Sequence, residues 1–122
     1  MTTQIFFENQ SLTRFELRDL DNRLFGQINE RGTYSFRLNF STSFNKEYRL
    51  ISANSQLSFT LNINGEIANV TNNNLFILQI GNETRCGKGN NKLTIIPITT
   101  PPVPPLRLIE EVPLPVLLYN DY

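Results

Sequence analysis

Histidine and tryptophan are absent from this sequence of 122 residues, and cysteine occurs once, as Cys86. Without histidine, the chain has neither a His-dependent catalytic triad nor the usual ligands of a catalytic zinc ion. A single cysteine forms neither an internal disulfide nor a thiolate metal cluster. Without tryptophan, the chain lacks the preferred stacking platform for sugars and bases. These absences favour a protein that is not an enzyme and that carries no metal or cofactor.

An excess of either charge is also missing, because 11 basic residues balance 11 acidic ones. Proteins that bind nucleic acids usually carry a basic excess, since neutralising phosphates supplies much of their affinity. The sequence therefore predicts no nucleic-acid partner. Zero net charge also removes the repulsion that keeps small proteins apart in solution. The charge balance thus favours a protein that associates with other subunits and forms a homo-oligomer.

Long apolar runs are missing as well. No stretch approaches the roughly 20 apolar residues of a membrane-spanning helix. The first ten residues, MTTQIFFENQ, have neither the basic region nor the apolar core of a secretory signal peptide. We therefore expect a protein without a membrane span that is made in the cytoplasm, with incorporation into a virion as one destination.

Alternation of apolar and polar residues is the dominant pattern that is present. Residues 33–40 (TYSFRLNF) and 56–63 (QLSFTLNI) each place four apolar side chains on one face of an extended chain. Residues 13–18 repeat the pattern over a shorter length. Strict alternation is typical of a strand with one buried and one solvated face.

The dipeptide Asn64-Gly65 follows the second alternating run and suits a two-residue type I′ hairpin, whose central residues need positive φ. Such a turn fixes the pairing of the strands on either side. The expected pairs are Ile63 with Glu66, Leu61 with Ala68, and Phe59 with Val70.

Four further strands are expected at residues 4–8, 23–28, 75–80 and 92–98. Residues 75–80 (LFILQI) are almost all apolar, which indicates a strand covered on both faces. Pro97 places the last strand at a sheet edge or marks its end. The polar residues 81–91 form the loop between them.

About eight strands, spaced roughly ten residues apart, indicate an all-β fold. We expect an antiparallel β-sandwich, either jelly-roll-like or immunoglobulin-like. Residues 45–52 are ambiguous, because the spacing of Phe44, Tyr48 and Ile51 also suits a short helix. The sandwich domain is expected to span residues 1–98.

Residues 99–122 form a segment of different character, which we call the C-terminal arm. It holds six of the seven prolines and nine Leu, Ile and Val residues. Proline excludes an ordinary helix or a central strand. The arm is nevertheless too apolar for a solvated linker, since disordered segments are poor in such residues. An extended apolar arm of this kind is expected to lie on a protein surface, either its own or a neighbour's.

Two motifs make the arm a candidate partner-binding segment. Residues 102–107 match P-x-x-P-x-R, a pattern that adopts polyproline II and docks on aromatic grooves or serves as a stiff spacer. Residues 114–118 alternate in a way that suits an added edge strand, where one side of the strand alone must donate hydrogen bonds. The candidate contact residues are Pro102, Pro105, Arg107, Leu108, Ile109, Leu114, Val116, Leu118 and Tyr119.

A second candidate lies in the loop at residues 85–92, RCGKGNNK. Three cations and two glycines in eight residues suit either a plain hairpin loop or a contact with an acidic partner through Arg85, Lys88 and Lys92. The pattern does not meet the P-loop motif. The sequence around Asp19 and Asp21 begins like a calcium loop but lacks its glycine and distal glutamate, which indicates a polar turn.

Together these features favour a non-enzymatic structural subunit of a larger assembly, whose arm docks on a neighbouring subunit. Small capsid, vertex and tail proteins of virions often combine a β-domain with such an arm, so a virion component is one hypothesis by analogy of architecture. The alternative is a soluble β-sandwich module that recognises a carbohydrate or a protein through its loops.

Overall fold

The computed structural model describes residues 1–84 and 89–98, which form nine β-strands and no α-helix. The strands are β1 (Thr2–Asn9), β2 (Phe15–Asp19), β3 (Leu24–Ile28), β4 (Thr33–Asn39), β5 (Lys46–Ile51), β6 (Gln56–Leu61), β7 (Ile67–Thr71), β8 (Phe76–Gly81) and β9 (Lys92–Pro97). The expected all-β class is confirmed, with nine strands in place of about eight. Pro97 is the last residue of β9, as its missing N–H predicted.

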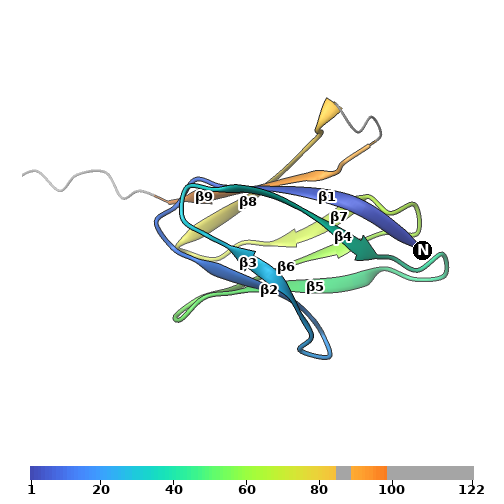
Figure 1. Cartoon of the computed structure of the whole chain (residues 1–122), viewed down its shortest axis with the longest axis horizontal. Helices are drawn as coiled ribbons and strands as arrows, with labels where there is room; N and C mark the ends of the chain where they lie inside the picture. The colour runs from blue at the N-terminus through green and yellow to red at the C-terminus, as the bar shows by residue number, and fades with distance from the viewer. Residues whose placement is uncertain (85–88, 99–122) are drawn as a thin grey trace, which may run out of the picture.

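Two sheets make up the fold, with the strand orders β4-β1-β9-β8 and β3-β2-β5-β6-β7. Figure 1 shows them as two layers, with β1 and β9 in the upper one and β2 and β5 in the lower one. Six of the seven strand pairs are antiparallel, but β1 and β9 are parallel. The expectation of a purely antiparallel sandwich is therefore wrong at this pair. Because most of the chain separates β1 from β9, no tight turn forces them to run in opposite directions.

The core lies between the two sheets and is formed by the inward-facing residues of their strands. Its fully or almost fully buried apolar residues are Ile5, Phe7, Phe15, Leu17, Ile28, Leu38, Tyr48, Leu50, Leu57, Phe59, Leu61, Ile67, Phe76, Leu78, Leu93 and Ile95. The alternation at residues 13–18, 33–40 and 56–61 is confirmed by this pattern of burial.

Tyr48 is the largest fully buried side chain, and its hydroxyl group donates a 2.6 Å hydrogen bond to the carbonyl oxygen of Asn39. Its ring stacks on Phe59 in the neighbouring strand, with ring centroids 5.6 Å apart. Burial raises the pKa of Tyr48 to about 12, because the phenolate form would lose its hydration. The hydroxyl group of this buried tyrosine is thus hydrogen-bonded to the backbone of the opposite sheet.

The β6–β7 hairpin differs from the predicted two-residue turn. Gly65 N–H donates to the carbonyl oxygen of Asn62, and Gly65 has φ of +76°. This is a longer loop that ends in a glycine bulge. Phe59 pairs with Val70 as predicted, but Leu61 pairs with Ile67 and not with Ala68. The shift turns Ile67 into the core, where it is 1% exposed, and leaves Ile63 in the turn, 48% exposed.

The structure resolves one ambiguous segment and corrects one expectation. Residues 46–51 form strand β5, not a helix, because Tyr48 and Leu50 both face the core in an alternating pattern. Strand β8 is buried on one face only, with Phe76 and Leu78 inside and Ile77 41% exposed. The described residues form only two sheets, so no third layer among them covers the outer face of β8.

Aromatic rings close the side of the sandwich between β3 and β4. The ring of Phe36 in β4 lies where a Cβ atom on Gly26 of β3 would be, so the two strands approach closely there. Tyr34 stacks beside Phe36, with ring centroids 6.5 Å apart, and occupies the space beside Gly32 in the same way. The missing side chains of these glycines thus make room for the rings that cover this side of the core.

Candidate protein-binding surface

All nine predicted contact residues of the C-terminal arm lie outside the described residues, as do Arg85 and Lys88 of the loop. The structure therefore bears on these predictions through the surfaces that adjoin them. The nine strands found among the described residues end at Pro97, and the described chain reaches Ile98 directly before the arm begins. The described end of the chain lies at the opposite end of the sandwich from the N-terminus (Figure 1).

Lys92 is the one loop cation that the structure describes, and a carboxylate already contacts it. Its Nζ lies 3.1 Å from Oε1 of Glu8, while Nε2 of Gln10 donates a 3.0 Å hydrogen bond to Oε2 of the same residue. The hydrogen bond from Gln10 and that from Lys92 lower the pKa of Glu8. Lys92 thus joins β9 to β1, and the carboxylate of Glu8 partly neutralises its charge.

An aliphatic strip lies on the outer face of β8 and β9, where the described chain ends. We define it as Leu75, Ile77, Ile96 and Ile98. Ile77 pairs with Ile96 across the two strands, and Ile98 N–H donates to the carbonyl oxygen of Leu75 at 2.9 Å. Three of the four side chains are 41–44% exposed. Clustered exposed apolar residues of this kind mark protein contacts more often than single ones do.

Asparagine side chains cover the first part of the free edge of β8, at Phe76 and Leu78. Oδ1 of Asn73 accepts hydrogen bonds from the N–H groups of Leu75 and Phe76, and Oδ1 of Asn72 accepts one from Leu78, all at 2.8 Å. Nδ2 of Asn73 also donates to Ser55 Oγ at 2.6 Å, which holds it in place. Covering an edge in this way prevents another strand from pairing with it.

The opposite edge of the same sheet, formed by β4, is open. The β1–β4 register directs the N–H groups of Tyr34, Phe36 and Leu38 toward β1. The backbone groups of the alternate residues 33, 35, 37 and 39 point away from it. Among the described residues no strand pairs with this edge, and the carbonyl of Asn39 alone has a partner, the hydroxyl of Tyr48.

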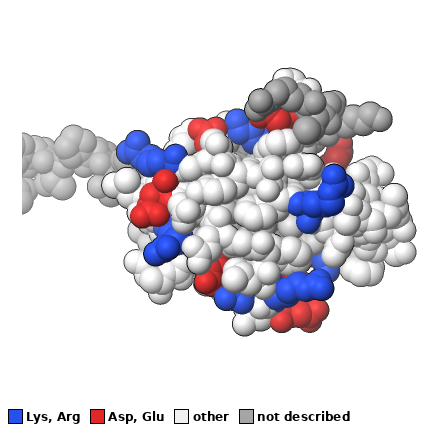
Figure 2. All heavy atoms as spheres, in the orientation of Figure 1, with Lys and Arg blue, Asp and Glu red and all other residues white. Residues whose placement is uncertain are grey.

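The surface on this side carries few charges. β3 and β4 lie nearest the viewer in Figure 1, and Figure 2 shows the same side with its charged side chains mostly around the rim. The inward-facing rings of Tyr34 and Phe36, which close this side of the sandwich, are half-buried there, beside the unpaired backbone edge of β4. An open strand edge beside half-buried aromatic rings is a suitable surface for a further strand.

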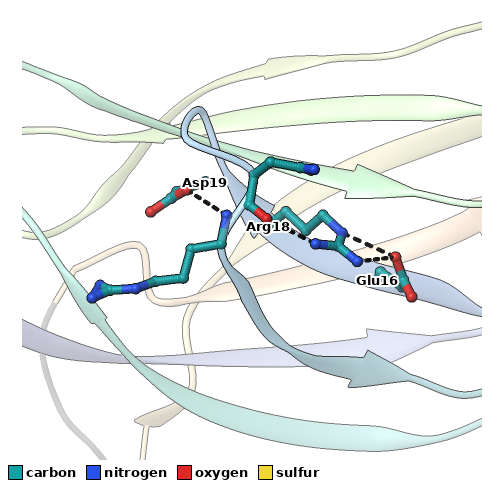
Figure 3. Close-up of polar contacts among 5 residues, drawn as sticks. Glu16, Arg18 and Asp19 are labelled. Atoms are coloured by element: carbon teal, nitrogen blue, oxygen red, sulfur yellow. Dashed lines mark hydrogen bonds and ion pairs between the residues drawn. The ribbon is translucent and has the colours of Figure 1, made fainter.

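The acidic turn between β2 and β3 has a structural role (Figure 3). Oδ1 of Asp19 accepts hydrogen bonds from the N–H groups of Asp21 and Arg23, both at 2.9 Å. Arg18 forms an ion pair with Glu16 at 2.9 Å and donates to the carbonyl oxygen of Asn22. The described residues contain no group of three or more side chains that could hold a metal ion. The expected polar turn is thus present.

An open depression of about 690 Å³ lies at the end of the sandwich where β2, β3 and β5 meet their loops. Its lining is mainly polar and includes Arg14, Glu16, Gln27, Glu30, Ser52 and Asn54. Sequence reasoning did not identify this depression, since its residues come from three separate segments. It did not identify the caps formed by Asn72 and Asn73 either, because a run of asparagines does not show which N–H groups its side chains reach.

No helix within the described residues is long and apolar enough to cross a membrane. No protein-family model matches the sequence, and the searches of curated proteins and of solved structures also give no match.

Proposed function

We propose that this protein is a non-enzymatic structural subunit of a larger protein assembly, in which the C-terminal arm of one subunit docks on the next. The observation that carries the proposal is the aliphatic strip, which lies at the point where the described chain passes into an arm rich in proline and aliphatic residues. Apolar surface on both sides of this junction favours burial against another protein. The sandwich is the rigid part of the subunit, and the arm extends from it to the next subunit.

Within this class, a capsid, vertex or tail component of a virion is the assembly we favour. The support is architectural: a small two-layer β-sandwich combined with an arm rich in proline and aliphatic residues. The balanced charge adds support, because subunits without net charge do not repel one another at close range.

Comparing the solution mass of the full chain with that of a chain ending at Ile98 tests the proposal. All nine strands remain in the shorter chain, so its far-UV circular dichroism spectrum should still be that of a folded β-protein. We expect the full chain to form an oligomer and the shorter chain to be monomeric. A shorter chain that assembles like the full one would exclude a role for the arm.

A β-sandwich module that binds a carbohydrate or protein through its loops is the second candidate, and the polar depression at the β2–β3–β5 end favours it. Its side chains offer both donors and acceptors in one open hollow. If this candidate is right, Gln27→Ala and Glu30→Gln should abolish ligand capture on a glycan array, while removal of the arm should leave capture unchanged.

A further inference from the structure

We propose that residues 113–119 of the arm of one copy add as a strand to the open edge of β4 in a second copy. This inference rests on the proposed function and names the acceptor surface that the arm uses. The observation behind it is a contrast between the two edges of one sheet: Asn72 and Asn73 cap β8, whereas the outward backbone groups of β4 have almost no partners among the described residues.

The arm sequence suits an edge strand that pairs with its neighbour through one side only. Residues 113–119 read PLPVLLY, and the prolines occupy positions 113 and 115. In an extended chain, alternate residues direct their N–H groups to opposite edges. Both missing donors therefore fall on one side of the strand. The other side keeps the N–H groups of Leu114, Val116 and Leu118, which can pair with the carbonyl groups of β4.

The side chains fit as well. A strand beside β4 places alternate residues next to the half-buried rings of Tyr34 and Phe36, at the side of the core. Residues 113–119 carry no charge, and the side of the sandwich that presents β4 has few charges at its centre (Figure 2). Apolar side chains of the added strand would thus extend the core without burying an unpaired charge.

The length of the arm favours a second copy as the acceptor. Residues 99–113 can span about 45 Å at roughly 3.1 Å per residue, which is enough to leave one sandwich and reach another. Four prolines at positions 101, 102, 104 and 105 stiffen the first part of the arm and oppose an immediate reversal onto its own domain. A neighbouring sandwich can accept the strand without that reversal.

A matched pair of arm variants tests the pairing. Val116→Pro removes an N–H group from the side that faces β4, whereas Leu117→Pro removes one from the side that already lacks donors. We expect Val116→Pro to abolish the oligomer in sedimentation velocity and Leu117→Pro to preserve it. Both substitutions lie beyond the described core, so the β-domain should keep its unfolding transition in each variant.

A second pair tests the acceptor. Ser35 of β4 directs its N–H away from β1, so Ser35→Pro blocks the open edge but leaves the ladder to β1 intact. Ser35→Ala is the control, because it removes the same hydroxyl, which accepts a hydrogen bond from Gln4, and retains the N–H. We expect oligomers with Ser35→Ala and monomers with Ser35→Pro.

Mixing the Ser35→Pro chain with the Val116→Pro chain shows whether the arm binds β4 of another copy or β4 of its own copy. The Ser35→Pro chain has an intact arm, and the Val116→Pro chain has an intact edge. We expect a mixture of the two to give a species of about 28 kDa, twice the chain mass of 14.0 kDa. A mixture that stays monomeric although the wild type assembles contradicts the proposal, as does equal behaviour of the two arm variants. In those cases, loss of assembly on truncation at Ile98 would still support the proposed function.

Discussion

The ring of Phe36 lies directly against Gly26, across the side of the sandwich where β4 and β3 meet. A Cβ atom at position 26 would overlap this ring, so a larger residue there must displace it from the core. Phe36 also contacts Phe7 edge-to-face, with ring centroids 5.8 Å apart. The pair therefore joins the two sheets at this side and lies next to the β4 edge on which we propose that the neighbour's strand docks.

Gly26→Ala should destabilise the protein by about 1–3 kcal/mol, because the new methyl group overpacks the contact with Phe36. Gly81→Ala is the matched control, since a Cβ atom there meets nothing within 4 Å. It should leave the free energy of unfolding unchanged or raise it by up to about 1 kcal/mol. Urea denaturation measures both values, and equal effects of the two substitutions would show that Phe36 does not fill the space beside Gly26.

Tyr48 makes the stability sensitive to high pH. Its pKa is 10.0 in an unfolded chain and about 12 in the folded protein, so its contribution is complete below pH 10 and is lost as the pH rises to about 12. Because the unfolded state releases this proton first, the free energy of unfolding should fall by up to about 1.4 kcal/mol per pH unit in this window. Tyr48→Phe should reduce that slope, and a slope that stays unchanged in the variant would contradict the assignment to Tyr48.

The asparagine caps on β8 should protect the protein against aggregation. Replacing both Asn72 and Asn73 with Ala exposes the N–H groups of Phe76 and Leu78 at a strand edge. We expect faster aggregation on warming, together with a loss of about 1–3 kcal/mol of stability. Asn74→Ala changes the same loop at an exposed position and serves as the control. Light scattering compares the variants, and no difference between them would mean that the caps do not guard this edge.

Glu8 should contribute stability that is lost in acid. Its folded-state pKa lies below the ordinary value of 4.5, so the contribution is present above pH 4.5 and disappears as the pH falls through the folded value. Since the carboxylate is about one-third exposed, solvent screening limits the effect to under about 1 kcal/mol. Glu8→Gln should flatten the stability curve below pH 4.5, measured by urea unfolding, and a curve that keeps its full slope would assign the acid sensitivity to other groups.

Much of the fold was predictable because alternation reports burial directly. In residues 33–39 and 56–61, alternate side chains face the core as the pattern of apolar residues indicated. The β6–β7 register was not predictable in full, because Asn64-Gly65 suits a type I′ turn and also suits a type I turn followed by a bulge at Gly65. The turn with the bulge places Ile67 in the core, and this packing between the sheets is not visible in the local sequence.

Strand β5 shows a second limit. Tyr48 and Ile51 suit a helical spacing, and the six-residue strand is too short for alternation to dominate the pattern. The candidate surfaces show a third limit. The open edge of β4 and the closed edge of β8 depend on the strand order, which pairs residues far apart in the sequence, and no local motif records it.

The mass of the full chain in solution, measured by sedimentation equilibrium over a range of concentrations, tests the central claim most directly. Our account predicts a species of at least about 28 kDa, twice the chain mass of 14.0 kDa, formed through the C-terminal arm. A homogeneous species of 14.0 kDa at every concentration would contradict it.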